Sequence, residues 1–331
     1  MEPLVSICCV TYNHAATLAQ ALDGFLMQRG VRVEVLVHDD ASTDGTQALL
    51  QSYADRYPDT VKPLYETENQ YRKGVAMDAT FNFPRATGEY IALCEGDDAW
   101  TDPDKLARQI DCLRAHPGAT FCFTNATVHD ASGRAPDRPF LPYYPEEAAW
   151  LAAEPAVYQL GRLTRLTFIP TASFVFPRAA LEAIPRAMLT APCPYGDLRL
   201  KLLLTAVGFA VYLPADTCLY RLNSAGSAMA RWGAEPAART RERCAQTLRM
   251  LADVQTLCGE RCQAELQCLR DAQLRVLLYA APTRALLRQP EARRVYRALP
   301  LPRRLLCRLK ACLPDDALRT LRTRLRRAPR A

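Results

Sequence analysis

Carboxylate side chains gather where predicted strands end. One predicted strand ends at Asp39 and Asp40, and a later one ends at a segment containing Glu95, Asp97 and Asp98. Like charges packed closely raise one another's pKa values unless a cation neutralises them. Mg²⁺ or Mn²⁺ suits such a site, because it takes oxygen ligands and leaves coordination positions for substrate phosphates. One Asp-Asp pair is usually a solvated turn, but two pairs at strand ends of one sheet predict a functional site.

The end of the first predicted strand excludes one class of enzyme. Thr11, Tyr12 and Asn13 stand there, and no Gly-x-Gly-x-x-Gly segment follows. Without that glycine-rich turn the backbone cannot approach a dinucleotide pyrophosphate closely. A hydride-transfer enzyme is therefore disfavoured.

Strands and helices alternate along the first two thirds of the chain. Strands are predicted at 5–10, 31–37, 61–65, 90–94 and 119–128, and helices at 15–28, 43–57, 76–86 and 102–115. This alternation predicts an α/β fold, with a mostly parallel sheet and helices on both faces. Ligands of such sheets bind beyond the carboxyl ends of the strands, where the carboxylates lie.

Three segments carry a resemblance to a known family. Residues 5–13, 38–46 and 88–106, the last containing Glu-Gly-Asp-Asp-Ala-Trp, resemble family-2 glycosyltransferases of the GT-A fold, in particular a bacterial subgroup. The resemblance covers about residues 3–228 and implies a GT-A catalytic domain over 1–228. Residues 165–173 resemble the acceptor-side strand of the subgroup, so a strand is expected there. It implies inverting transfer of a sugar to an acceptor hydroxyl in surface-polysaccharide or lipid-linked glycan synthesis. The implied donor is a nucleotide-diphosphate sugar, a UDP-sugar first, with dTDP- and GDP-sugars as alternatives.

The resemblance also implies roles for individual residues in donor binding. Asp40 matches the aspartate that bonds the nucleotide base, and Tyr12 matches the residue stacked near it. Asp97 matches the aspartate near the ribose, and Asp98 matches the ligand of the Mg²⁺ or Mn²⁺ ion that offsets charge on the departing diphosphate. The expected nucleotide-sugar-binding set is Thr11, Tyr12, Asn13, Asp40, Lys73, Asp97 and Arg221. For Lys73, a solvated loop charge is an equally good interpretation.

A general base must lie across the sugar from the diphosphate. Asp197 is the only acidic residue between 185 and 213, and it opens an apolar helix predicted at 198–207. The segment resembles the family's catalytic-base segment, and a helix N-terminus favours the ionised carboxylate. A plain helix N-cap is the alternative. Relatives often carry a histidine where Asn223 stands, which puts a histidine contact to the diphosphate in doubt, while Arg221 is placed to face phosphate.

The last third of the chain is basic. Residues 1–228 carry 19 basic and 26 acidic side chains, whereas 229–331 carry 23 and 9. The region 229–331 is predicted to be helical over 236–280, with amphipathic helices at 301–313 and 317–327 suited to an anionic membrane surface. A solvated basic end is the alternative. No nucleic-acid-binding module supports a nucleic-acid partner.

The remaining features concern location and competing functions. The N-terminus lacks signal-peptide features and no run of 18 apolar residues occurs, so a cytoplasmic protein, peripheral on the inner membrane face, is expected. Thirteen cysteines then indicate free thiols in a reducing compartment. Two functions compete with glycosyl transfer. A sugar nucleotidyltransferase would need a glycine-rich basic loop after its first strand, and a non-catalytic scaffold would keep the fold without the activity.

Overall fold

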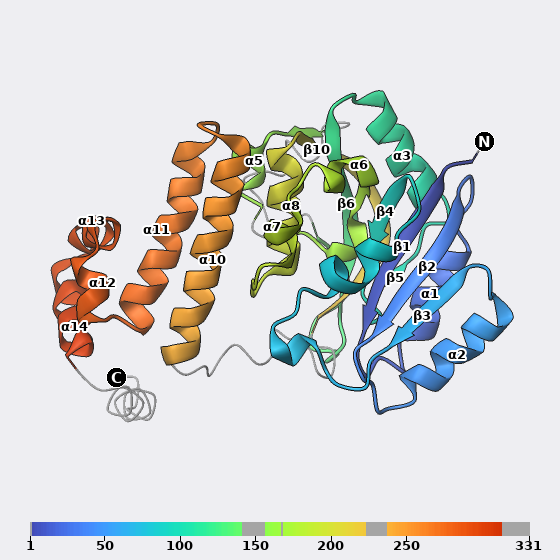
Figure 1. Cartoon of the computed structure of the whole chain (residues 1–331), viewed down its shortest axis with the longest axis horizontal. Helices are drawn as coiled ribbons and strands as arrows, with labels where there is room; N and C mark the ends of the chain where they lie inside the picture. Colours follow the sequence, from blue (N-terminus) through green and yellow to red (C-terminus); the bar gives the residue numbers. More distant parts are fainter. Residues whose placement is uncertain (1, 141–155, 167, 223–236, 313–331) are drawn as a thin grey trace. The chain divides into compact units, whose positions relative to one another are not determined.

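The computed structural model describes residues 2–140, 156–166, 168–222 and 237–312 (Figure 1). The chain forms two compact units, Met1–Ala230 and Arg231–Ala331, which we describe separately. The thirteen cysteines all lie in described residues, and none is joined to another by a disulfide.

The first unit is built on one mixed sheet in which the long pairings are parallel and the short ones antiparallel. Its strands follow the order β3 (Val61–Tyr65), β2 (Arg32–Asp39), β1 (Leu4–Thr11), β4 (Tyr90–Leu93), β9 (Val175–Pro177), β6 (Ala119–Asp130), β10 (Phe209–Leu222) and β5 (Ala99–Trp100). β7 (Arg138–Pro139) pairs with β6, and β8 (Ala156–Tyr158) pairs with β10. The expected α/β fold with a mostly parallel sheet is confirmed.

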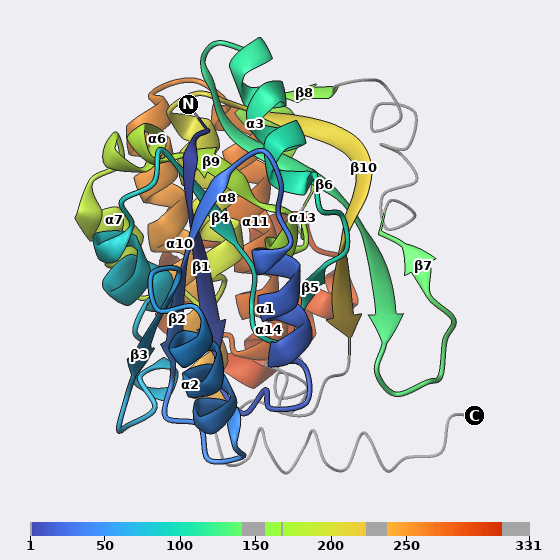
Figure 2. The same cartoon turned by 90° about the vertical axis from the view of Figure 1, so that its right-hand side faces the viewer.

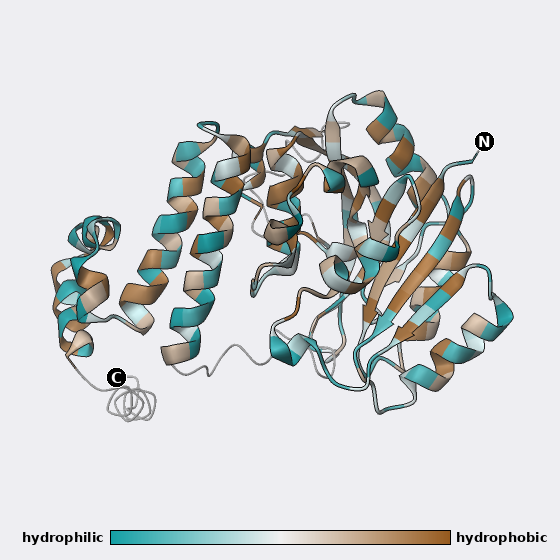
Figure 3. Cartoon of the chain, viewed as in Figure 1, coloured by the Kyte–Doolittle hydropathy of each residue, from teal (hydrophilic) through white to brown (hydrophobic). Residues whose placement is uncertain are grey.

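Helices cover both faces of this sheet. α1 (Leu18–Leu26), α2 (Thr46–Arg56) and α3 (Lys105–Ala115) lie on one face, in front of the strands in Figure 2. The other face meets α5 (Leu160–Leu163), α6 (Arg178–Glu182), α7 (Arg186–Thr190), α8 (Gly196–Ala206) and the π-helical turn η2 (Asp78–Asn82). β1 is apolar on both sides, because Ile7 and Cys9 face the α1 side and Cys8 faces η2. Figure 3 shows this hydrophobic character along β1 and β2.

Three predicted elements differ from the structure. The helix expected at 76–86 is replaced by η2 and a 3₁₀ turn, η3 (Phe83–Arg85), because Pro84 has no N–H to continue a regular helix. α3 begins at Lys105 rather than Asp102, whose Oδ1 accepts a hydrogen bond from the Asp104 N–H at 2.9 Å. The strand expected at 165–173 is absent from the described residues of that segment, which ends in a 3₁₀ turn, η6 (Thr171–Ser173).

The second unit is helical, as predicted. It contains α10 (Ala237–Cys258), α11 (Gln263–Ala280), α12 (Arg284–Arg288), α13 (Pro290–Ala298) and α14 (Leu301–Ala311). Its core joins α11 to the last three helices through buried side chains, among them Leu278, Leu286, Val295 and Cys307. The helix predicted at 317–327 lies outside the described residues. Among the described helices, none has the length and apolar character needed to cross a bilayer.

Candidate active site

Four strands bring their carboxyl ends to one edge of the sheet. β1 pairs in parallel with β2 and β4. β10 runs in the same direction, because β9 is antiparallel to both β4 and β6, and β6 is parallel to β10. Thr11 is in register with Asp39, and the Asp40 N–H donates to the Thr11 carbonyl at 2.9 Å. This edge therefore collects the ends of segments that are more than 200 residues apart in the chain.

The loop after β4 places carboxylates in a buried position at this edge. Asp98 is 2% exposed, and its pKa is raised well above the usual range by burial and then by the charges of Asp97 and Glu95. The pKa of Glu95 is raised in the same way, by burial and then by Asp97, with contributions from Asp78 and Asp197. The cluster thus holds more negative charge than its surroundings offset, which is the situation that favours a bound cation.

Arg221, near the end of β10, is hydrogen-bonded to the loop that follows β4. Its backbone N–H donates to Asp98 Oδ1 at 2.8 Å, and its guanidinium donates to the Asp97 carbonyl at 2.6 Å and to Gln20 Oε1. Arg221 lowers the pKa of Asp98, but the net shift stays upward. The structure thus brings Arg221, Asp97 and Asp98 together. Asn223 lies outside the described residues.

Asp40 is held by backbone amides. It is 1% exposed, and its two carboxylate oxygens accept hydrogen bonds from the Gln70 and Tyr71 N–H groups at 2.6 and 3.1 Å. Asp40 therefore positions the turn η1 (Tyr71–Lys73). Lys73 lies at the end of that turn, with Nζ 2.6 Å from Glu68 Oε2 at an exposed position. Each Asp40 oxygen keeps a second lone pair with which a base N–H could bond.

Asn13 joins the loops after β1 and β2. Its backbone adopts a left-handed conformation with φ of 57°, which asparagine tolerates better than most residues. Its N–H donates to Ser42 Oγ at 2.8 Å, and its Oδ1 accepts from the Thr43 N–H at 2.8 Å. Asn13 thus fixes the loop in which half-buried Tyr12 lies. These bonds give Asn13 a positioning role in the structure.

Asp197 lies near the carboxylate cluster of Glu95, Asp97 and Asp98, but it belongs to a separate element, helix α8. It is the second residue of that helix and is half-buried. Tyr195 occupies the N-cap position, so Asp197 is not the cap. The Asp197 carboxylate makes no hydrogen bond or ion pair with a residue in the described ranges, and its charge helps to raise the pKa values of Glu95 and Tyr220. Its carboxylate is therefore close to the cluster and available to accept a proton.

Residues 6–182 match the sequence profile of a family described as "Glycosyl transferase family 2". That stretch is more than half of the chain. The chain belongs to glycosyltransferase family 2.

Curated relatives align with part of this glycosyltransferase. The uncharacterised protein Rv1520 of Mycobacterium tuberculosis is 43% identical over 141 residues, which are 42% of this chain and 39% of Rv1520. "Succinoglycan biosynthesis protein ExoO" of Rhizobium meliloti is 35% identical over 133 residues, 40% of this chain and 36% of ExoO. The "UDP-Glc:alpha-D-GlcNAc-diphosphoundecaprenol beta-1,3-glucosyltransferase WfgD" of Escherichia coli is 33% identical over 110 residues, 33% and 41% of the two chains. The matched stretch thus spans about two fifths of each relative.

Two solved glycosyltransferase structures share the fold. S. aureus TarS residues 1–349 in complex with UDP-GlcNAc superpose with a TM-score of 0.59 at 15% identity, covering 98% of this chain and 92% of that one. The mannosyltransferase PcManGT from Pyrobaculum calidifontis, in complex with GDP-Man and Mn²⁺, gives 0.54 at 21% identity, with 97% and 88% covered. These matches show that the glycosyltransferase has a GT-A-like fold.

The residues of this glycosyltransferase fit a divalent cation that is held mainly by its substrate. No group of three or more His, Cys, Asp or Glu side chains is arranged to hold a metal ion within the part of the chain that the structure describes. The buried carboxyl of Asp98, with its raised pKa and its neighbours Asp97 and Glu95, nevertheless matches what one hard cation would stabilise. Mg²⁺ is commonly bound by one or two carboxylates plus substrate phosphates, which agrees with this donor set.

Gly96 lets the carboxylate loop lie directly against the end of β1. A Cβ atom at this position would be 2.7 Å from Thr11 Oγ1 and 3.0 Å from His14 Nδ1. These two atoms are buried and find no hydrogen-bond partner within the described residues. The opposite ring nitrogen of His14 lies 3.9 Å from Asp97 Oδ2. His14, which stands apart from any metal-site spacing in the sequence, is thus placed beside the cluster.

Asp78 is a second residue that sequence reasoning missed. Burial raises its pKa to about 6, although Asn82 Nδ2 donates a hydrogen bond to its Oδ1 at 2.8 Å. Asn82 also donates to the Cys9 carbonyl in β1. The available signal was an Asp and an Asn one turn apart in an otherwise apolar segment predicted as a helix against the sheet. Asp78 therefore adds negative charge to the same region from a separate element.

Proposed function

We propose that this family-2 glycosyltransferase transfers a sugar from a nucleotide-diphosphate donor, a UDP-sugar, to an acceptor hydroxyl with inversion of configuration. We further propose that its acceptor belongs to a surface polysaccharide or a lipid-linked glycan. The observation that carries the proposal is the buried Asp98 cluster with a separate carboxylate, Asp197, near it. The names of ExoO and WfgD and the UDP-GlcNAc complex of TarS support the donor and acceptor classes.

Asp197 is the proposed general base. It would accept the proton of the attacking hydroxyl, which requires a distance of about 2.6–3.2 Å in the substrate complex. A base that already bonded to other protein groups would have to break those bonds first. The Asp197 carboxylate has no such bond to the described residues, so it is free of that cost.

The donor side is assigned to the sheet edge. Asp98, with Asp97 beside it, would hold Mg²⁺ or Mn²⁺, and the bound ion would supply Lewis-acid stabilisation of the leaving diphosphate. Tyr12 and Asp40 are proposed to contact the nucleotide base, with Thr11 and Asn13 shaping the loop around it. Arg221 would face the diphosphate, while Lys73 would approach the nucleotide only if it left Glu68. Residues 1–228 would form the catalytic domain, and 229–331 a separate basic domain.

Donor turnover tests the proposal. The protein should be stabilised against heat by one class among UDP-, dTDP- and GDP-sugars, more strongly with Mn²⁺ than without, and should hydrolyse or transfer that donor. Asp98→Ala should lower turnover at least about 100-fold, because the cation loses its carboxylate ligand. Asp111→Ala, which removes an exposed carboxylate on α3, serves as the matched control and should turn over normally.

The rival functions give different results in the same assay. A sugar nucleotidyltransferase would form the donor from a nucleoside triphosphate and a sugar phosphate, with release of pyrophosphate. A non-catalytic scaffold would turn over no nucleotide-sugar under any metal condition. Either result would contradict the proposal.

A further inference from the structure

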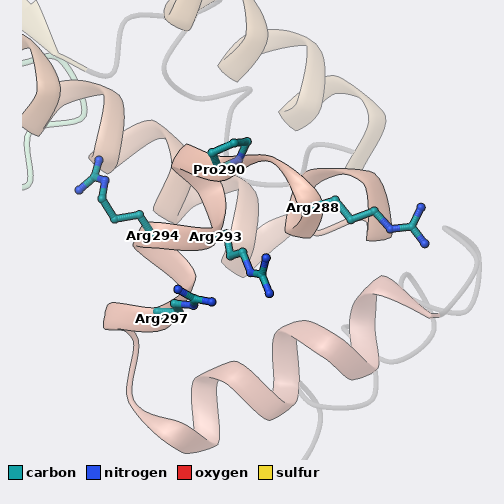
Figure 4. Close-up of a pocket in the computed structure, with 5 residues that line it drawn as sticks. All are labelled: Arg288, Pro290, Arg293, Arg294 and Arg297. Atoms are coloured by element: carbon teal, nitrogen blue, oxygen red, sulfur yellow. The ribbon is translucent and has the colours of Figure 1, made fainter.

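An arginine-lined hollow of about 400 Å³ lies in the second unit. Arg288 from α12 and Arg293, Arg294 and Arg297 from α13 surround it, together with Pro290 (Figure 4). Arg293 and Arg297 are one turn apart, so they project from the same face of α13. The ends of the Arg293 and Arg297 side chains lie near each other in Figure 4, whereas Arg288 extends outward, and Arg294 is neutralised by a neighbouring carboxylate.

The charge of this hollow is largely uncompensated. Arg294 donates to Asp271 Oδ2 of α11 at 2.8 Å. Arg288, Arg293 and Arg297 make no ion pair with any residue in the described ranges. Like charges held together cost free energy, which an anion in the hollow would offset. The planar arginine fork matches the geometry of a phosphate group, so a phosphate is the anion that these side chains recognise best.

An exposed row of leucines lies on α14, the next helix. Leu301, Leu305 and Leu309 are 62%, 58% and 57% exposed and follow one another at intervals of four residues, on one face of the helix. The opposite face is buried through Cys307, whose Sγ lies 3.0 Å from the Leu278 carbonyl in α11. The leucine row therefore points away from the core of the unit, and nothing in the described residues covers it.

The helix that carries this leucine row also carries basic side chains that reach aromatic rings of neighbouring helices. The Arg303 guanidinium lies 5.4 Å from the ring centre of Tyr279 in α11, and that of Arg308 lies 5.9 Å from the ring centre of Tyr296 in α13. An exposed leucine face on a helix that also carries exposed arginines is the pattern of a helix that lies in a membrane interface. From 281 to 312 the chain has nine basic residues and one acidic residue, so the charge of the whole segment agrees.

We propose that α12–α14 form a docking surface for an anionic phospholipid membrane, in which a lipid phosphate enters the Arg288–Arg293–Arg297 hollow and the Leu301–Leu305–Leu309 row enters the acyl boundary. A nucleic acid would explain the arginines but not the exposed leucines. This surface is independent of the glycosyl-transfer site, so its test does not depend on activity.

The test is vesicle co-sedimentation of the full chain. Phosphatidylcholine vesicles with phosphatidylglycerol should bind it, and pure phosphatidylcholine should not. Arg293→Gln/Arg297→Gln should reduce partitioning about tenfold or more, since each basic residue near an anionic bilayer accounts for roughly fivefold. The matched control is Arg239→Gln/Arg249→Gln, which removes the same charge from exposed positions on α10 and should change partitioning less than about twofold.

A second variant separates the leucines from the charges. Leu305→Ser/Leu309→Ser should also lower partitioning, and the binding that is left should be lost at lower salt than in the wild type, because only screened electrostatic attraction persists. All variants should melt like the wild type. Equal losses in the α13 and α10 variants, binding that ignores lipid charge, or binding to RNA but not to vesicles would each overturn the proposal. Inorganic phosphate that abolished vesicle binding while neutral vesicles bound equally well would also contradict it.

Discussion

At the scale of single residues, the role of Asp197 gives the most direct prediction. Asp197→Asn keeps the size and the polar character of the side chain but removes its ability to accept a proton. Turnover should fall about 10²–10⁴-fold, while the affinity for the nucleotide-sugar should stay unchanged, because the donor is bound at the sheet edge. Steady-state transfer kinetics and calorimetric titration with UDP measure the two quantities. Normal turnover by this variant would remove Asp197 from the base role.

The sequence predicted some of these residues better than others. Asp97 and Asp98 were predictable, because a carboxylate pair after an apolar strand can be read from local order. The contact of Arg221 with Asp98 depends on the register of β10, which the chain order alone does not reveal. The inward positions of Asp78 and His14 depend on packing against β1, so spacing rules could not identify them.

At the scale of elements, the loop between β4 and β5 depends on one glycine. Gly96→Ala should destabilise the protein by about 1–3 kcal/mol, because the new methyl group would overlap Thr11 and force the carboxylate loop to shift. Gly196→Ala at the start of α8 is the matched control. A Cβ there meets nothing within 4 Å, so this change should leave stability equal or slightly higher. Urea unfolding of both variants checks the difference, and equal stabilities would show that the loop can yield.

The strand–helix alternation was sufficient to predict the α/β architecture, but not its antiparallel insertions. The run of apolar residues in β1 predicts a strand buried on both faces, and the structure has one. β9 is three residues long and inserts antiparallel between β4 and β6. A strand this short has no periodicity of its own, so its place is decided by pairing between segments that are distant in the chain. The helix prediction for 76–86 was wrong for a local reason, because Pro84 has no N–H to continue a regular helix.

At the scale of the whole molecule, the charges are divided between the two units. The first unit carries the carboxylates and a net charge of −7 over residues 1–228, whereas 229–331 carry +14. Some carboxylates of the first unit lie together at one edge of the sheet, where folding buries them away from water. Part of the basicity of the second lies around one hollow and one exposed leucine row. The net charge of +7 is therefore the sum of an acidic region, residues 1–228, and a basic region, residues 229–331.

The buried carboxylates predict an unusual dependence of stability on pH. Asp78 has a pKa of about 6 when folded and 3.8 in its reference state, and the pKa values of Glu95 and Asp98 are raised as well. At pH values between the unfolded and the folded pKa, these carboxyl groups are therefore protonated in the folded protein and ionised in the unfolded chain. Their stabilising contribution is complete below about pH 4 and is lost as the pH rises through 6 and beyond. In the absence of divalent ions, this contribution to the free energy of unfolding should decrease between pH 5 and 8.

Comparison with Asp78→Asn isolates this effect from other titrating groups. The pKa of His38 is lowered by burial, so His38 favours the folded state increasingly as the pH rises through the same range and opposes the carboxylates. Asn cannot ionise, so the stability of the variant relative to the wild type should increase by about 1.4 kcal/mol from pH 5 to pH 8. Urea unfolding at both pH values measures this difference. A constant difference would mean that Asp78 stays ionised in the fold, and the carboxylates at the sheet edge would then be better solvated than their burial indicates.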